Sequence, residues 1–173
     1  MVSVIRWVFL SLCVISCVTQ SNAEGGASAS GGDHTSWRGT FLGQSKDDVK
    51  KALEGKLTAE EETSEGKPVI RARDASGKEC GTLSIEDGTV VAMSLNTCFF
   101  GLDDSISDRD FAKIILDHYD IASFEPADPS DFQQMFGVSV VYKGNTSHGE
   151  AVSVFAVMGS PVVNVDPQPK GEF

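Results

Sequence analysis

Two cysteines could form a covalent link within the body of the chain. Cys80 and Cys98 stand beside runs of β-forming residues, and their spacing does not match the CxxC motif of thiol redox enzymes. In an oxidising compartment two such thiols are expected to pair, and a loop of this length gives a disulfide worth about 3 kcal/mol. We therefore predict a structural disulfide between Cys80 and Cys98, with a redox or free-thiol role as the alternative.

The oxidising compartment is itself predicted from residues 1–23, which have the composition of a secretory signal peptide. Arg6 supplies the positive charge, and the apolar stretch 7–16 is too short to span a bilayer as a helix. Ser21-Asn22-Ala23 places small residues where a signal peptidase would cleave. Export to the periplasm or the medium is therefore expected.

The same leader admits a second interpretation. Val14-Ile15-Ser16-Cys17 resembles the lipobox of bacterial lipoproteins, in which Cys17 would be lipidated. Residues 24–36, rich in Gly, Ser and Ala, would then form a flexible linker to the membrane. Contact with a membrane is expected only if Cys17 carries lipid, and cleavage after Ala23 is the favoured alternative.

No constellation of side chains predicts catalysis or metal binding. No histidine has a second ligand at a metal-binding spacing, and the acidic cluster near residue 105 does not fit a calcium loop. Acidic residues are also favoured at the start of a helix. We predict no catalytic residue, metal or cofactor; the side chains considered were His34, His118, His148, Asp103, Asp104, Asp108 and Asp110.

The aromatic residues are expected mainly in the core. Phe99 and Phe100 form the one adjacent apolar pair that a binding partner could contact, although core packing is the commoner role of such a pair. Phe124, Phe132 and Phe136 are predicted to be buried.

Charge excludes one class of partner. The 173 residues include 14 Lys and Arg against 25 Asp and Glu, a net charge of −11. Such an acidic surface repels the phosphates of nucleic acids and anionic lipid headgroups, so no nucleic-acid partner is expected. With 40% hydrophobic residues the chain is expected to fold around a core.

Two helices are predicted, and each follows a Ser-x-x-Asp sequence that can cap its first turn. They begin after Ser45 and Ser107 and carry apolar residues at i, i+3 and i+4. β-rich runs follow each helix, at 68–73, 81–85 and 90–95 and then at 137–142, 151–158 and 162–165; Asp87-Gly88 is a strong hairpin signal. The acidic residues 60–62 are interpreted as solvated chain, and Asp128 and Asp131 as turn residues.

These elements predict an α+β fold. Residues 37–101 form one unit and residues 102–173 a second, each with one helix followed by an antiparallel β-meander of about three strands. The repeated order indicates a tandem duplication. Chance recurrence of a common helix start is the alternative.

The run from Gly43 to Leu53, together with Ile85-Glu86-Asp87-Gly88-Thr89-Val90, resembles the helix-and-meander unit of the SmpA/OmlA (BamE-like) envelope lipoproteins. Tandem use of such a unit is similar to the β-lactamase inhibitory proteins. The chain departs from the pattern after the helix, where Leu53-Glu54-Gly55-Lys56 replaces the usual Gly-x-Pro. The resemblance implies an envelope or secreted protein that acts by binding another protein.

The function expected from the sequence is therefore that of a non-enzymatic extracytoplasmic protein-binding module, an inhibitor or an envelope assembly factor. It would use the open face or the edge of its sheet. Two alternatives remain: an extracytoplasmic hydrolase or ligand-binding enzyme whose site is scattered along the chain, and a lipid-anchored structural protein of the envelope.

Overall fold

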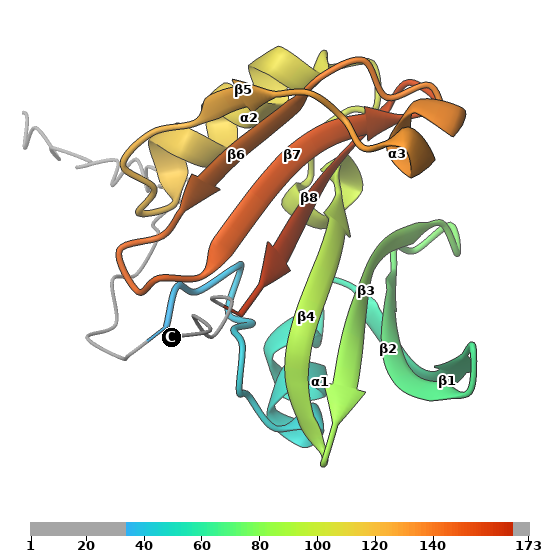
Figure 1. The fold of residues 1–173 in the computed structure, drawn as a ribbon. Helices are drawn as coiled ribbons and strands as arrows, with labels where there is room; N and C mark the ends of the chain where they lie inside the picture. The colour runs from blue at the N-terminus through green and yellow to red at the C-terminus, as the bar shows by residue number, and fades with distance from the viewer. Residues whose placement is uncertain (1–33, 168–173) are drawn as a thin grey trace, which may run out of the picture.

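The computed structural model describes residues 34–167 (Figure 1). The helices are α1 (Lys46–Leu53), α2 (Asp108–His118) and α3 (Asp131–Met135), with a 3-10 turn, η1 (Thr97–Phe100). The strands are β1 (Thr58–Ser64), β2 (Lys67–Arg73), β3 (Glu79–Glu86), β4 (Thr89–Asn96), β5 (Glu125–Ala127), β6 (Val141–Asn145), β7 (Ala151–Val157) and β8 (Ser160–Asp166). The predicted signal peptide 1–23, Cys17 and most of the predicted linker 24–36 lie outside the described residues.

All eight strands belong to one antiparallel sheet of order β1-β2-β3-β4-β8-β7-β6-β5 (Figure 1). The predicted α+β class with antiparallel meanders is confirmed. The last strands of the two halves, β4 and β8, pair at the centre, with Ser94 opposite Asn164. The two predicted units thus share a continuous sheet. Their origin by tandem duplication remains a prediction.

Both Ser-x-x-Asp sequences begin helices as predicted. Ser45 Oγ accepts a hydrogen bond of 3.2 Å from the backbone N of Asp48, and Ser107 Oγ accepts one of 3.1 Å from Asp110 N. Each hydroxyl also donates to the carboxylate of the same Asp, at 2.7 Å in both helices. These bonds hold the first turn and place negative charge at the positive end of the helix dipole.

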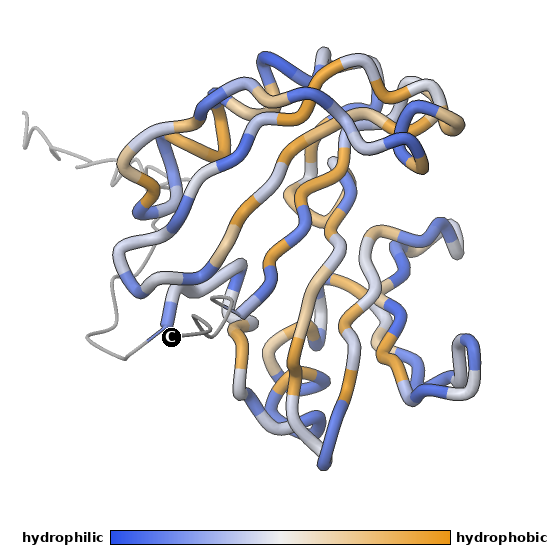
Figure 2. Tube along the Cα trace, in the orientation of Figure 1, coloured by the Kyte–Doolittle hydropathy of each residue, from blue (hydrophilic) through white to orange (hydrophobic). Residues whose placement is uncertain are grey.

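The acidic run 60–62 is largely exposed, as its interpretation as solvated chain implied, but it forms the middle of the edge strand β1. Glutamates have low β propensity, but here they alternate between two sets of cations. Glu61 pairs with Lys46 and Lys50 of α1, while Glu60 and Glu62 pair with arginines of β2. Contacts with distant residues thus override the local preference, and β1 is mostly hydrophilic (Figure 2), with Ala59 packed against the core.

The second half also departs from the prediction. Glu125–Ala127 forms the short strand β5, and Asp131 lies in the first turn of α3 instead of a loop turn. Phe132 and Phe136 were expected in the core, but 69% and 42% of their surfaces are exposed. The reason is that α3 lies at the end of the sheet and turns its aromatic side chains outward.

The main core lies between the sheet and the two longer helices. Val49 and Leu53 of α1 and Phe111 and Ile115 of α2 are buried against alternate residues of the central strands. Leu83 of β3 belongs to the same cluster. The opposite face of the sheet is therefore not covered by α1 or α2. Within residues 34–167, no helix has the length and apolarity needed to cross a membrane.

The predicted disulfide is present between Cys80 in β3 and Cys98 in η1, with a Cα–Cα distance of 5.1 Å. It fixes η1 against the end of the sheet. Gly81 permits this approach, because a Cβ atom there would lie only 2.9 Å from Leu95 Cδ2 and 3.2 Å from the ring of Phe99. The sulfur pair and the buried ring of Phe99 thus form one tightly packed corner of the core.

Tyr119 closes the core at the end of α2 and provides a test of this packing. Its ring stacks on the fully buried Trp37 at a centroid distance of 4.4 Å, and burial raises the pKa of Tyr119 to about 12. This folded-state pKa exceeds that of the unfolded chain. The contribution of the neutral phenol to stability is therefore fully present below about pH 10, and about 2 kcal/mol of it is expected to be lost as the pH rises towards 12.

Urea unfolding of the wild type and of Tyr119→Phe between pH 9 and pH 11 measures this effect. The wild type should lose more stability than the variant over that interval, because only the wild type has the partly buried phenol to ionise. Parallel losses in the two proteins would show that Tyr119 does not titrate as a buried group.

Candidate protein-binding surface

The uncovered face of the sheet presents a row of polar residues that crosses all eight strands. We call it the polar row. Its members lie directly opposite one another in the strand register, so their side chains point to the same side. From β5 to β1 the row is Glu125, Lys143, Ser153, Asn164, Ser94, Thr82, Arg71 and Glu60.

The centre of the polar row carries short side chains, and its two ends carry charges of both signs. Ser153, Asn164 and Ser94 are partly exposed at the middle of the sheet. Neighbouring Ala92 of β4 and Ser84 of β3 are also short and partly exposed. A partner could therefore approach the central strands closely, while the outer strands offer charged groups on either side.

At the β1–β2 end the charges form an ion-pair network. Arg71 Nε lies 2.7 Å from Glu62, and Arg71 also pairs with Glu79 of β3. Arg73 contacts Glu62 at 2.9 Å and Glu60 at 3.0 Å. Hydrogen bonds from Arg73 and then Arg71 lower the pKa of Glu62 below its ordinary value. The network fixes the arginines on the sheet and gives the free edge of β1 an acidic character, which disfavours addition of another strand there.

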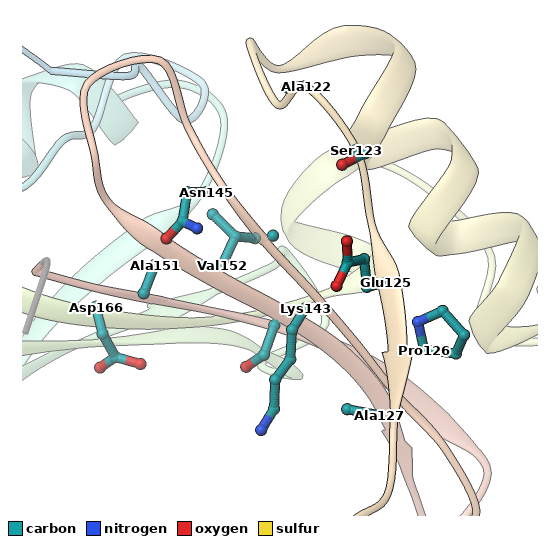
Figure 3. A pocket seen from close by; sticks show the side chains of 12 residues that line it. Ala122, Ser123, Glu125, Pro126, Ala127, Lys143, Asn145, Ala151, Val152 and Asp166 are labelled. Atoms are coloured by element: carbon teal, nitrogen blue, oxygen red, sulfur yellow. The ribbon is translucent and has the colours of Figure 1, made fainter.

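At the other end a pocket of about 640 Å³ opens over β5 to β8 (Figure 3). Glu125 of β5 and Lys143 of β6 lie opposite each other in register, and Asp166 of β8 lines the same hollow. Partial burial raises the pKa of Asp166 above its ordinary value. The remaining lining consists of short side chains, small apolar ones together with the polar Ser123, Asn145 and Ser153. The pocket can therefore accept hydrogen-bonding or charged groups of a partner.

A second, smaller core lies on the uncovered face beside this pocket. Val141 and Phe155 are buried there, with Val138 from the chain after α3 and the partly buried Val157. Val138 anchors the α3 segment against the sheet. The α3 segment therefore lies next to the uncovered face, at one end of the sheet (Figure 1).

The predicted partner-binding pair Phe99 and Phe100 is not on this surface. Phe99 is fully buried, so it is a packing residue and is not accessible to a partner. Phe100 is partly buried, with its ring 5.6 Å from that of Phe111 and 5.8 Å from that of Tyr119. The turn η1, fixed by the disulfide, directs both rings inwards.

The candidate polar residues considered from the sequence are also dispersed. His118 Nδ1 lies 3.0 Å from the carbonyl oxygen of Ile114 on the outside of α2. Asp104 pairs with Lys78 and accepts from Thr97, and these contacts lower its pKa. His34 lies 3.7 Å from the buried carboxylate of Glu150. Across the described range 34–167, no three His, Cys, Asp or Glu side chains are grouped to hold a metal ion.

Sequence reasoning missed the α3 segment, although one signal marks it. Ser130 Oγ accepts from Gln133 N at 3.2 Å, and Gln133 Oε1 accepts from Ser130 N at 2.9 Å, which forms a capping box. The sequence Ser-Asp-Phe-Gln that makes this box is visible without a structure.

Comparisons of the chain with family models, with curated proteins and with solved structures gave no match.

Proposed function

We propose that the protein is an exported, non-enzymatic protein-binding module, an inhibitor or an envelope assembly factor, that binds another protein through the uncovered face of its sheet. The observation that carries the proposal is the polar row, with short side chains at its centre and charges at both ends. A face of this composition stays soluble when free and leaves room for larger side chains of a partner.

The size of the face supports binding of a protein. Eight strands about 4.8 Å apart span about 34 Å, and strands of this length extend about 20 Å, so the face measures roughly 700 Å². A stable protein–protein interface covers about 800 Å² on each partner. The exposed part of this face, with the α3 segment that covers Val141 and Phe155, approaches that size.

The positions of the polar side chains favour binding over the rival hydrolase. A scattered catalytic site would bring His118, Asp117 or Tyr119 into a pocket with other polar groups. Instead His118 caps α2, Asp117 pairs with Lys113 on its outer surface, and Tyr119 stacks in the core. The pocket is lined by short side chains and by groups that suit recognition.

Export and the form of the N-terminus complete the proposal. The Cys80–Cys98 disulfide is compatible with an oxidising compartment. The mass of the mature N-terminus distinguishes the two forms expected from the leader. A chain that begins at Glu24 would be a free periplasmic or secreted protein, and a chain that begins at lipidated Cys17 would be anchored to a membrane, as the alternative structural envelope protein would be.

Affinity capture with matched variants tests the binding function. The mature protein serves as bait in an extract of the envelope and medium of the cells that make it. In Ser94→Arg/Asn164→Arg two long cations fill the centre of the polar row. Retention of the partner by this variant should fall at least tenfold.

The control variant Asp47→Asn/Glu54→Gln changes the net charge by the same amount at the exposed ends of α1, away from the polar row. It should retain the partner as the wild type does. Circular dichroism checks that both variants fold. Failure of the wild type to retain any specific protein, or equal retention by all three baits, would refute the proposed function.

A further inference from the structure

The large exposed apolar side chains of the described residues all belong to α3, to the residue that ends it, and to the turn that joins β7 to β8. The exposed fractions are 69% for Phe132, 81% for Met135, 42% for Phe136 and 85% for Met158. We call these four residues the apolar cluster. The rings of Phe132 and Phe136 lie 5.0 Å apart, and Met158 N donates to the carbonyl oxygen of Phe136 at 3.4 Å. Two segments joined by a backbone hydrogen bond therefore present these four exposed side chains.

Specific contacts hold the apolar cluster in this arrangement. A helix of five residues is not stable by itself, yet α3 has a complete capping box at Ser130 and a bond of 3.0 Å from Gln134 Nε2 to the carbonyl oxygen of Pro129. Gly137 reverses the chain with a φ of 77°, and Val138 then enters the second core. The segment is thus anchored by Val138 and displays its larger apolar residues to solvent.

The charge near the apolar cluster indicates which partner would cover it. Residues 128–138, which lead into and form the α3 segment, include two acidic side chains, Asp128 and Asp131, and no Lys, Arg or His. Asp131 begins α3 itself, and Asp128 immediately precedes its capping region. Acidic groups beside an apolar patch attract Lys and Arg and repel anionic lipid headgroups. A basic protein segment is therefore favoured over a membrane surface.

We propose that the apolar cluster is a docking surface for a basic amphipathic segment of another protein. Apolar side chains of the segment would cover Phe132, Met135, Phe136 and Met158, and its Lys or Arg side chains would face Asp128 and Asp131. Methionine side chains adapt to apolar surfaces of different shapes, and aromatic residues supply large contact areas. The inference rests on the proposed protein-binding function and identifies the chemistry of the partner.

Two synthetic peptides test this docking surface. One is a 14-residue amphipathic peptide of Leu and Lys, and the other replaces each Lys by Glu. Each is titrated into the isotope-labelled mature protein while backbone amide resonances are recorded. The Leu/Lys peptide should shift amides of residues 131–138 and 158–160, with an affinity that falls as salt is added. The Leu/Glu peptide should bind at least tenfold more weakly.

Variants of the protein distinguish binding of the Leu/Lys peptide to the apolar cluster from general attraction of a basic peptide to an acidic protein. Met135→Ser/Met158→Ser should weaken binding of the Leu/Lys peptide at least tenfold. Asp128→Asn/Asp131→Asn should weaken it and reduce its salt dependence. The control Glu65→Gln/Glu86→Gln removes the same number of charges from exposed positions of the first half, a turn and the end of β3, and should leave the affinity within twofold of the wild type.

Several outcomes would overturn the inference. These are amide shifts confined to other regions, equal binding of the two peptides, or no effect of Met135→Ser/Met158→Ser. If sedimentation shows that the wild type is a dimer and that this variant is not, the surface binds a second copy of the chain. If zwitterionic vesicles retain the wild type, the surface binds lipid. The affinity capture separates this inference from the proposed function. If the Ser94→Arg/Asn164→Arg bait no longer retains the partner but the Met135→Ser/Met158→Ser bait retains it fully, the docking surface is refuted and the proposed function stands.

Discussion

Replacing Phe99 by Ala is expected to lower the free energy of unfolding by about 3–5 kcal/mol, because the ring is fully buried and its removal leaves a cavity. The loss should be hard to relieve. Phe99 fills the corner beside Gly81, and η1, the turn that contains Phe99, is tied to β3 by the disulfide, so the surrounding chain cannot collapse freely. Urea unfolding followed by circular dichroism measures the change.

Phe132→Ala is the matched control, since the same atoms are removed from a ring that is 69% exposed. Its effect on stability should be within about 0.5 kcal/mol. Similar losses in the two variants would contradict the assignment of Phe99 to the core and of Phe132 to the surface.

Removal of the disulfide should have the next largest effect. The double variant Cys80→Ala/Cys98→Ala is expected to lose about 3 kcal/mol of stability, mainly because the unfolded chain regains the freedom of an 18-residue loop. Alanine is chosen because Cys80 is fully buried in apolar surroundings. The reduced wild type should unfold at a urea concentration similar to that of the double variant.

Thiol titration provides the control for this comparison. The native mature protein, denatured without reductant, should show no free thiol from Cys80 or Cys98, and reduction should release both. Two reactive thiols in the unreduced protein would contradict the bonded pair, and an unchanged stability on reduction would show that the bond does not constrain the fold.

The elements that could be predicted from the sequence are those with strong local signals. Ser45 and Ser107 cap α1 and α2 through bonds that involve residues only three positions away. Asp87 and Gly88 adopt φ values of 49° and 79° in the turn between β3 and β4, which is the conformation that this dipeptide favours. The disulfide followed from the expectation of export and from the count of cysteines.

The elements that were missed depend on distant contacts. β1 is acidic along its middle, and its pairing is stabilised by Arg71 and Arg73 from the next strand. β5 has only three residues, which is too few to show a pattern. For α3 the capping box was visible at Ser130, but the outward direction of Phe132 depends on where the helix lies relative to the sheet.

The sequence predicted that an open sheet face would bind a partner, but it did not identify the residues of that face. An open sheet face was expected, yet the polar row exists only because the register places Ser94 between Thr82 and Asn164. A shift of one residue would turn each of these side chains to the opposite face. Phe99 and Phe132 are both aromatic residues near polar neighbours, and only the tertiary structure distinguishes the buried ring from the exposed one.

Chemical footprinting of the uncovered face tests the central claim most directly. Ser94→Cys places one thiol at the centre of the polar row, and Lys51→Cys places one on the exposed surface of α1. Modification of each thiol by a maleimide is timed with and without the captured partner, while Cys80 and Cys98 stay bonded. The partner should slow modification at position 94 at least tenfold and leave the rate at position 51 unchanged. Equal rates at position 94 with and without the partner would contradict binding through the uncovered face.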